Sequence, residues 1–337
     1  MNLKTIAQKA GVSTATVSNV INGNHHKVSR ATIEKVQRII ADMEYSPNAT
    51  ARSLASRRSR IIGVVVANID SEENFFSNPH YAHLLALLEQ HIRSAGYYMM
   101  LRCVGRCSES ISLFSSWNVD GMIFFGTVTS DVEEVKNSIR VPSVFIDAYA
   151  QEDQDIANVG IDDYKGGYLS GKFLLENGHR CIAAVGSGMS FYGVMGQRFR
   201  GLCQACGEYG VEVPWNHVFD CRTEYSQGVE VGRAIARSPI PFTAVASMSD
   251  IVAFGIMEGL RMEGKRVPED VSVIGFDNLL ECQYTYPKLT TVSQNTEQKA
   301  LRVSQRLLRM LRGEQEPTGT EISDVSVSVR DSVKDIR

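Results

Sequence analysis

The spacing of apolar residues predicts three short helices in the first 45 residues. Residues 3–10 form the first, Gly11 supplies a turn, and Ser13 is placed to cap a second helix that runs to Asn22. A third helix follows its cap, Ser29, and ends before Pro47, because the residue before a proline avoids the helical region. The residues expected to share a core are Leu3, Ile6, Ala7, Ala10, Val17, Val20, Ile21, Ile33, Val36, Ile39, Ile40 and Met43. This segment is therefore a small helical domain.

From residue 61 the pattern changes to short β-rich apolar runs that alternate with helical segments. Residues 81–92 and 164–177 have helical spacing, and Gly96 and Gly178 end these two helices. Repeated strand–helix units with short buried strands predict parallel sheets covered on both faces. Because roughly 270 residues exceed one ordinary domain, we expect two α/β lobes. The predicted strands are residues 61–67, 97–104, 121–126, 143–146, 181–186, 243–247 and 271–276.

Length and composition agree with a folded cytoplasmic protein. The 337 residues predict two domains, or two and a small appendage, at roughly 150 residues per domain. The longest apolar stretch, residues 61–69, contains Gly63 and Asn68 and is far shorter than the roughly 20 residues that span a bilayer. Lys4 and Lys9 stand where an export signal needs an apolar core, and seven cysteines, an odd number, are typical of reduced thiols. We expect no membrane segment.

The net charge of −3 hides a strong asymmetry. Residues 1–60 contain ten Lys or Arg against three Asp or Glu, a net charge of +7, whereas the remainder carries −10. A basic head on an acidic body favours a polyanionic partner, because a protein that neutralises phosphates releases their condensed counterions.

Residues 6–22 meet the requirements of a helix-turn-helix, with small Ala7 where the helices cross, Gly11 in the turn and buried Val12 and Val17. The chain here resembles the lactose-repressor (LacI) family of bacterial transcription regulators. The matches, in chain order, are AGVSTATVSNVIN at 10–22, YSPNATARSLAS at 45–56, IGVVV at 62–66, NPHYAHLL at 78–85, GHR at 178–180, RFRG at 198–201, VSVIGFDN at 271–278 and LTTVSQ at 289–294. The resemblance therefore covers nearly the whole chain.

The resemblance implies a set of DNA-contacting residues. The positions that distinguish operators within the family are Thr14, Ala15 and Asn19, and those expected to contact phosphates or shared bases are Ser13, Thr16, Ser18 and Asn22. The segment matching 48–56 is a hinge that becomes helical on operator DNA and wedges its leucine, here Leu54, into the minor groove, while Arg52 and Arg57 approach phosphates. The alternative is that Leu54 packs only on the larger domain. The loop 23–28 is one residue longer than in the purine-repressor pattern, which leaves the contacts of His25 and His26 open.

The same resemblance implies a domain plan: a helix-turn-helix domain at 1–46, a hinge at 47–60, and an effector-binding and dimerisation domain at 61–337. The last is expected to have the two-lobed fold of periplasmic sugar-binding proteins, with three crossovers and a ligand cleft. The expected lobes are an N-lobe of about 61–161 and 291–318 and a C-lobe of about 162–290 and 319–334.

Strand ends point to the effector site independently. Asp147, Asp250 and Asp277 each follow a predicted strand, and ligands of open α/β sheets gather at the carboxyl ends of strands. Carboxylates accept hydrogen bonds from vicinal hydroxyls, and an arginine donates several, so this set suits a polyol. By resemblance, the ligand-facing positions are Arg198, Asp277, Asp147, His80, Tyr81, Ser249 and Thr223. Asp250 has the alternative of only capping a helix.

Some features depart from the family pattern or admit other uses. Thr223 stands where some relatives have a stacking aromatic, a role that Phe191 or Tyr192 could take instead, and residues 71–77 resemble an insertion that reshapes one wall of the pocket. His80 with His83, and Cys203 with Cys206, lack the further ligands of a metal site, so we expect free thiols, no metal and no cofactor.

The prediction is therefore a DNA-binding repressor of carbohydrate-utilisation genes, controlled by a small effector, most simply a sugar, that releases it from DNA. A purine or a partner protein as the regulator, a carbohydrate-acting enzyme using paired aspartates, and a secreted sugar receptor are the alternatives. We find no phosphate-binding loop and no nucleophile elbow. Because the helix expected at 298–312 is followed by no leucine heptads, we expect homodimers rather than tetramers.

Overall fold

The computed structural model describes residues 3–21, 23–43, 58–67, 75–126, 129–149, 155–190 and 193–337. Two compact units divide the chain, a head of Met1–Ser59 and a body of Arg60–Arg337. Among the described residues, no helix combines the length and apolarity needed to cross a membrane.

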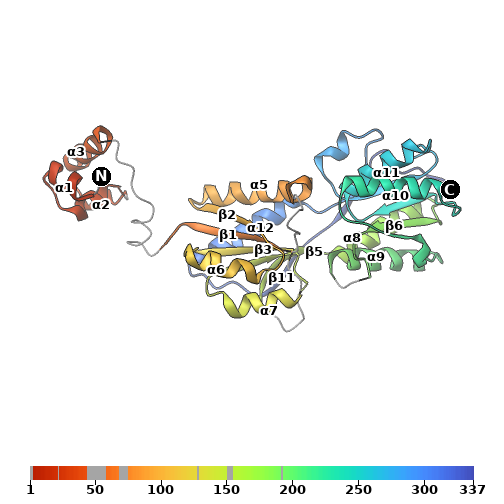
Figure 1. The fold of residues 1–337 in the computed structure, drawn as a ribbon, viewed down its shortest axis with the longest axis horizontal. Coiled ribbons are helices and arrows are strands. Elements are labelled where there is room, and N and C mark those ends of the chain that lie inside the picture. The colour runs from red at the N-terminus through yellow and green to blue at the C-terminus, as the bar shows by residue number, and fades with distance from the viewer. Residues whose placement is uncertain are drawn as a thin grey trace. The chain divides into compact units, whose positions relative to one another are not determined.

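The head is the predicted bundle of three helices (Figure 1), α1 (Leu3–Ala10), α2 (Thr14–Ile21) and α3 (Arg30–Asp42), with a 3-10 turn η1 (His25–Lys27) before α3. Its core consists of Ile6, Ala7, Ala10, Val17, Val20 and Val36. Gly11 makes the turn between α1 and α2 at φ 68°. The hydroxyls of Ser13 and Ser29 accept hydrogen bonds from the backbone N–H groups of Thr16 (3.1 Å) and Thr32 (3.3 Å), so both predicted caps are confirmed.

The body contains two six-stranded sheets, and all strand pairs described are parallel except β10 with β12. The first sheet has the order β11 (Gly319–Ser323), β5 (Ala157–Ile161), β4 (Ser143–Ile146), β3 (Gly121–Phe125), β1 (Ile61–Val66), β2 (Tyr98–Cys103). The second has the order β12 (Ser326–Ser328), β10 (Thr290–Ser293), β9 (Ser272–Asp277), β8 (Ala244–Ser247), β6 (Ile182–Gly186), β7 (Val218–Asp220). This confirms the predicted pair of parallel α/β lobes.

Helices cover both faces of each sheet (Figure 1). In the N-lobe, α5 (Pro79–Ser94) and α12 (Thr296–Leu311) lie on one face and α6 (Ser108–Ser116) and α7 (Thr129–Ser138) on the other. In the C-lobe, α8 (Asp163–Glu176) and α9 (Val194–Glu208) face α10 (Tyr225–Arg237) and α11 (Asp250–Met262) across the sheet. The short 3-10 turns are η2 (Phe75–Ser77), η3 (Trp215–His217) and η4 (Leu280–Gln283).

Two of the expected lobe boundaries are wrong. The chain returns to the N-lobe after β10 rather than before residue 291, and β11, expected in the C-lobe with 319–334, belongs to the N-lobe sheet. β11 is a largely exposed edge strand, so its sequence lacks an apolar run. It is held beside β5 because the Arg306 guanidinium donates to the carbonyls of Asn158 (2.7 Å) and Gly319 (3.2 Å). The third crossover therefore joins β11 to β12.

Two glycines allow α8 and α9 to cross at backbone contact. A Cβ on Gly167 would collide with the carbonyl oxygen of Arg198, and a Cβ on Gly201 would collide with the carbonyl oxygen of Tyr164. This explains the spacing of Arg198 and Gly201 in the RFRG segment, because the same close contact positions Arg198 beside the first turn of α8.

We expect Gly201→Ala to lower the free energy of unfolding by at least about 2 kcal/mol, because the methyl group must separate two packed backbones. Gly207→Ala is the matched control on the same helix: nothing lies within 4 Å of its added Cβ, so stability should stay level or rise by about 0.5 kcal/mol. Urea denaturation of the two variants measures the difference, and equal stabilities would contradict the packing described.

Candidate functional site

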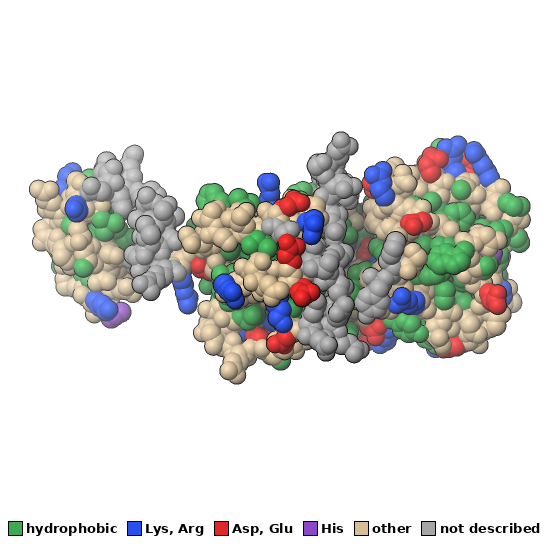
Figure 2. Space-filling model, turned by 60° about the horizontal axis from the view of Figure 1, so that its bottom comes forward, with side chains coloured by type: hydrophobic (Ala, Val, Ile, Leu, Met, Phe, Trp, Pro, Cys, Tyr) green, Lys and Arg blue, Asp and Glu red, His purple; other side chains and the backbone are tan. Residues whose placement is uncertain are grey.

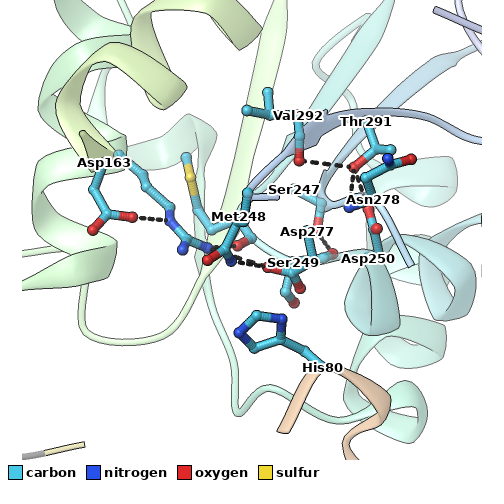
Figure 3. A network of polar contacts seen from close by, with 12 residues as sticks. His80, Asp163, Ser247, Met248, Ser249, Asp250, Asp277, Asn278, Thr291 and Val292 are labelled. Atoms are coloured by element: carbon cyan, nitrogen blue, oxygen red, sulfur yellow. Dashed lines mark hydrogen bonds and ion pairs between the residues drawn. The ribbon is translucent and has the colours of Figure 1, made fainter. Parts of the chain in front are cut away.

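Several side chains at the carboxyl ends of the C-lobe strands converge on one buried arginine (Figure 3). Asp277 ends β9, Met248 and Ser249 follow β8, and Asp163 is the first residue of α8. The predicted positions Arg198, Asp277 and Ser249 are all buried here. The sheet topology thus brings together residues that are up to 114 positions apart in the sequence of the C-lobe.

Arg198 is held on several sides. Its Nε donates to Asp163 Oδ1 (2.8 Å), its Nη1 donates to the Met248 carbonyl (2.7 Å), and its guanidinium lies 3.6 Å from the centre of the Phe276 ring. Burial alone would lower the pKa of Arg198, but the neighbouring carboxylates of Asp163 and Asp277 raise it above its ordinary value. The arginine is therefore a fixed cation.

Asp277 has a pKa far from that of an ordinary aspartate. Its Oδ1 accepts a hydrogen bond from Gln294 Nε2 (2.5 Å) and lies 3.9 Å from Arg198 Nη1. Burial raises the pKa of Asp277 to about 7, with the Asp250 carboxylate adding to the rise and Arg198 opposing it. Asp277 is therefore poised between its two protonation states near neutral pH.

Asp147 faces the site from the N-lobe, where it follows β4. Its two oxygens accept hydrogen bonds from Lys299 Nζ (2.9 and 2.8 Å), and its side chain is 13% exposed. Both Asp147 (φ 51°) and Asp277 (φ 129°) have positive φ, which costs a side-chain-bearing residue about 1 to 3 kcal/mol and is typical of functional sites.

His80 is the predicted residue with an unused hydrogen-bonding atom. It lies in the first turn of α5, is 5% exposed, and its Nδ1 has no hydrogen-bond partner among the described residues. Burial, followed by the charges of Lys299 and Arg198, holds the pKa of His80 well below its ordinary range, so the ring is neutral. Figure 3 shows the ring directed from the N-lobe toward Ser249 and Asp277.

Of the remaining predicted residues, Tyr81 and Thr223 have other surroundings, whereas Ser249 lies within the site. Tyr81 stacks on Phe75 (ring centres 4.8 Å apart) and meets Phe125 edge-on (5.0 Å), so it belongs to an aromatic cluster of the N-lobe. Thr223 is half-buried in the loop between β7 and α10. Ser249 precedes α11 as its first flanking residue but makes no side-chain capping bond.

Asp250 acts as a structural acid. It is fully buried, and its oxygens accept hydrogen bonds from the Thr291 hydroxyl (2.6 Å), the Leu279 N–H (2.9 Å) and the Cys282 thiol (3.1 Å). These bonds hold the loop that follows β9 rather than capping α11. Protein donors occupy both oxygens of Asp250, so its contacts are those of a structural acid, and the expectation that it also faces a ligand stays a prediction.

Sequence reasoning missed four residues that complete the site: Asp163, Lys299, Gln294 and Tyr149. The Tyr149 hydroxyl donates to Asp163 Oδ2 (2.6 Å), and Lys299 also donates to Gln294 Oε1 (2.8 Å). The sequence did contain a sign that Lys299 is buried, because it shares the apolar face of its helix with Val303 and Leu307. A lysine on that face needs a buried acid as partner.

In the head, the predicted DNA-contacting residues gather at the start of α2. Thr14 and Ala15 are exposed, and Ser18 and Asn19, one helical turn later, are half-buried. The Ser13 and Thr16 hydroxyls are hydrogen-bonded to each other (2.9 Å). Figure 2 shows Lys, Arg and His side chains on the head, whereas basic and acidic side chains mix over the body. The exposed start of α2 therefore presents short side chains on a head that carries basic residues.

Some predictions fall outside the described residues: Asn22, Arg52, Leu54, Arg57, Phe191, Tyr192 and 71–74. Among the residues that are described, no group of three His, Cys, Asp or Glu is placed to hold a metal ion. His83 instead lies 3.5 Å from Glu297, and all seven cysteines are free. Burial raises the pKa of Cys203, and that of Cys206 to about 12, so both remain thiols near neutral pH.

The protonation of Asp277 predicts a pH dependence of stability. Because the pKa of this carboxyl is about 7 in the folded chain, against an ordinary value of 3.8, the native state binds the extra proton and stability falls as pH rises from about 4 to about 7. Asp277→Asn should remove up to about 1.4 kcal/mol per pH unit of that slope. Chemical denaturation at a series of pH values checks this, and an unchanged slope would contradict it.

The comparisons with known proteins match both units. Residues 2–48 match the family of bacterial regulatory proteins of the lacI type, and residues 172–333 match a periplasmic binding protein-like domain. The HTH-type transcriptional repressor PurR of Mannheimia succiniciproducens is 32% identical over 92% of this chain and 90% of its own. The ribose operon repressor of Haemophilus influenzae is 28% identical over 99% of both chains.

Solved structures give the same assignment of the fold. The lac repressor dimer bound to operator and an anti-inducer has a TM-score of 0.87 at 24% identity, covering 99% of both chains. A LacI-family regulator from Enterococcus faecium with bound ribose has a TM-score of 0.70 at 26% identity, covering 82% of this chain and 100% of its own. The cellobiose complex of the regulator CelR has a TM-score of 0.73 at 27% identity, covering 98% and 99%. With its helix-turn-helix head and two-lobed body, the chain belongs to the lacI family of bacterial regulatory proteins.

Proposed function

We propose that the chain is a transcriptional repressor that binds double-stranded operator DNA through α2 and is controlled by a small effector, a sugar, held where the two lobes meet. The observation that supports DNA binding most strongly is the face formed by Thr14, Ala15, Ser18 and Asn19 on the outside of a basic three-helix unit. Short polar side chains on an exposed helix suit the major groove. The relatives are themselves named as repressors.

A polar, hydroxyl-bearing effector fits the site. Figure 3 shows His80 of the N-lobe near Asp277 and Ser249 of the C-lobe. Arg198 lies beside Asp277, and Asp147 is linked to Asp277 through Lys299 and Gln294, so donors and acceptors from both lobes lie close together. Ribose and cellobiose are bound by two regulators of similar fold and 26–27% identity. A purine is the second candidate, because repressors named PurR are among the similar relatives. We propose a sugar, because two carboxylates and one neutral imidazole match hydroxyl groups better than a flat ring.

Binding, rather than catalysis, is the role we propose for the aspartates. Asp147 is paired with Lys299, and Asp277 is bonded to Gln294 beside Arg198, so protein donors already hold both carboxylates, as suits groups that position a ligand. We further propose a cytoplasmic homodimer whose two heads read the halves of a near-palindromic site. Leu54 would enter the minor groove at its centre, and Arg52 and Arg57 would approach phosphates. Effector binding would move the lobes and weaken the hold on DNA, a coupling that is typically about 5- to 150-fold in affinity.

Asn19→Ala should weaken binding of the full-length protein to a retarded genomic fragment by about 10-fold or more, because a base-edge contact is typically worth about 1–3 kcal/mol. Gln37→Ala on the exposed side of α3 is the control and should bind as the unmodified chain does. Gel retardation in two salt concentrations measures both. Equal affinities for Asn19→Ala and Gln37→Ala would contradict the proposed contact between α2 and DNA.

A thermal-shift series with ribose, cellobiose, galactose, hypoxanthine and guanine tests the effector class. A sugar present at 100 times its dissociation constant adds about 2.7 kcal/mol of stability, and we expect at least one sugar and neither purine to raise the melting temperature. His80→Leu should reduce that shift, whereas His83→Leu, whose side chain is about half exposed, should retain it. If a purine, and no sugar, raised the melting temperature, the sugar proposal would be wrong and a purine would be the effector.

A further inference from the structure

The two effector-facing carboxylates, one in each lobe, are joined by a continuous line of hydrogen bonds. Lys299 Nζ on α12 donates to both oxygens of Asp147 and to Gln294 Oε1, and Gln294 Nε2 donates to Asp277 Oδ1. Gln294 lies on the crossover between β10 of the C-lobe and α12 of the N-lobe. We call Lys299 and Gln294 the crossover relay.

The orientation of Gln294 is fixed by its neighbours. Its carbonyl oxygen must face the Lys299 ammonium, which only donates, and its amide nitrogen must face the Asp277 carboxylate, which accepts. Gln294 is 2% exposed and the Lys299 side chain is 0% exposed, so these bonds are largely shielded from water. Bonds to charged groups in such surroundings are strong and depend on exact placement of the partners.

A buried lysine costs stability unless its charge is paired, and Lys299 has its acid, Asp147, at 2.8 Å. An apolar residue would fill the same place among Ala300, Val303 and Leu307 without needing a partner. The pairing therefore gives Asp147, and through Gln294 also Asp277, a defined position relative to the crossover. A second line of hydrogen bonds also joins the ends of β4 and β9. The Tyr149 hydroxyl, close after Asp147, donates to Asp163, and Asp163 accepts from Arg198, which lies beside Asp277.

From this geometry we propose that the crossover relay fixes the lobe arrangement that favours DNA binding, and that an effector acts by taking over Asp277 from Gln294. This rests on the proposed function. An effector hydroxyl that donates to Asp277 Oδ1 competes with Gln294 for that oxygen. A weakened bond to Gln294 would then alter the position of Lys299, and through it that of Asp147 in the other lobe. Lys299 and Gln294 are thus positioning residues, and a chain without the relay behaves as the effector-bound form does.

Two variants separate this role from a purely structural ion pair. Lys299→Met alone leaves Asp147 without its cation and should lower both the melting temperature and DNA affinity. The double variant Asp147→Asn with Lys299→Met removes both charges, so most of the stability should return. DNA affinity should not return with it: we expect binding about 5- to 150-fold weaker than that of the unmodified chain, with no effector added.

The control is Gln298→Glu, at an exposed position in the first turn of the same helix, because a glutamate still accepts the hydrogen bond from Asn295. This variant should leave stability and affinity unchanged. Affinity is measured by fluorescence anisotropy on a genomic duplex that the unmodified full-length protein retards, and lobe arrangement by small-angle X-ray scattering. A double variant that binds the duplex as tightly as the unmodified protein and scatters identically would overturn the relay. If the unmodified protein retards no duplex, the proposed function fails instead, and the scattering curves still decide whether the relay sets the lobes.

Discussion

The burial of Arg198 is the constraint on which the effector site depends. A guanidinium inside a protein needs both charge compensation and hydrogen-bond acceptors, and here Asp163, Asp277 and the Met248 carbonyl supply them. Meeting this need draws the first turn of α8, the end of β9 and the end of β8 to one point. Gly167 and Gly201 contribute by allowing α8 and α9 to approach closely enough for the ion pair to form.

The same constraint leaves the site with more acid than base. In the described part of the site, Asp147, Asp163 and Asp277 face Arg198 and Lys299, and burial raises the pKa of both Asp163 and Asp277. A proton on one of the aspartates, or hydrogen-bond donors from a ligand, would compensate the excess negative charge. Hydroxyl groups are such donors and therefore suit this site. His80, neutral and with an unused ring nitrogen, completes the set from the other lobe.

Local patterns predicted the three head helices, seven strands and the strand-terminal aspartates, because each of these leaves a periodicity or a cap within a few residues. The rest depended on distant partners. β11 is an edge strand that Arg306 holds in place. The role of Gln294 follows only from its two hydrogen-bond partners, Asp277 and Lys299, which the folded chain brings to either side of it. Asp250 shows the limit of that pattern: it follows a strand as Asp277 does, but three protein donors use its oxygens. Sequence position alone does not distinguish an acid that faces a ligand from one that holds a loop.

The head carries the proposed DNA-binding surface, and the body carries the proposed effector site that controls it. The central claim is that paired heads read a specific duplex. Selection from a random duplex library by the full-length protein, followed by sequencing, tests it most directly. The account predicts enrichment of a near-palindromic site with two matching halves. Binding that persists without enrichment of any sequence, or no binding at all, would contradict it.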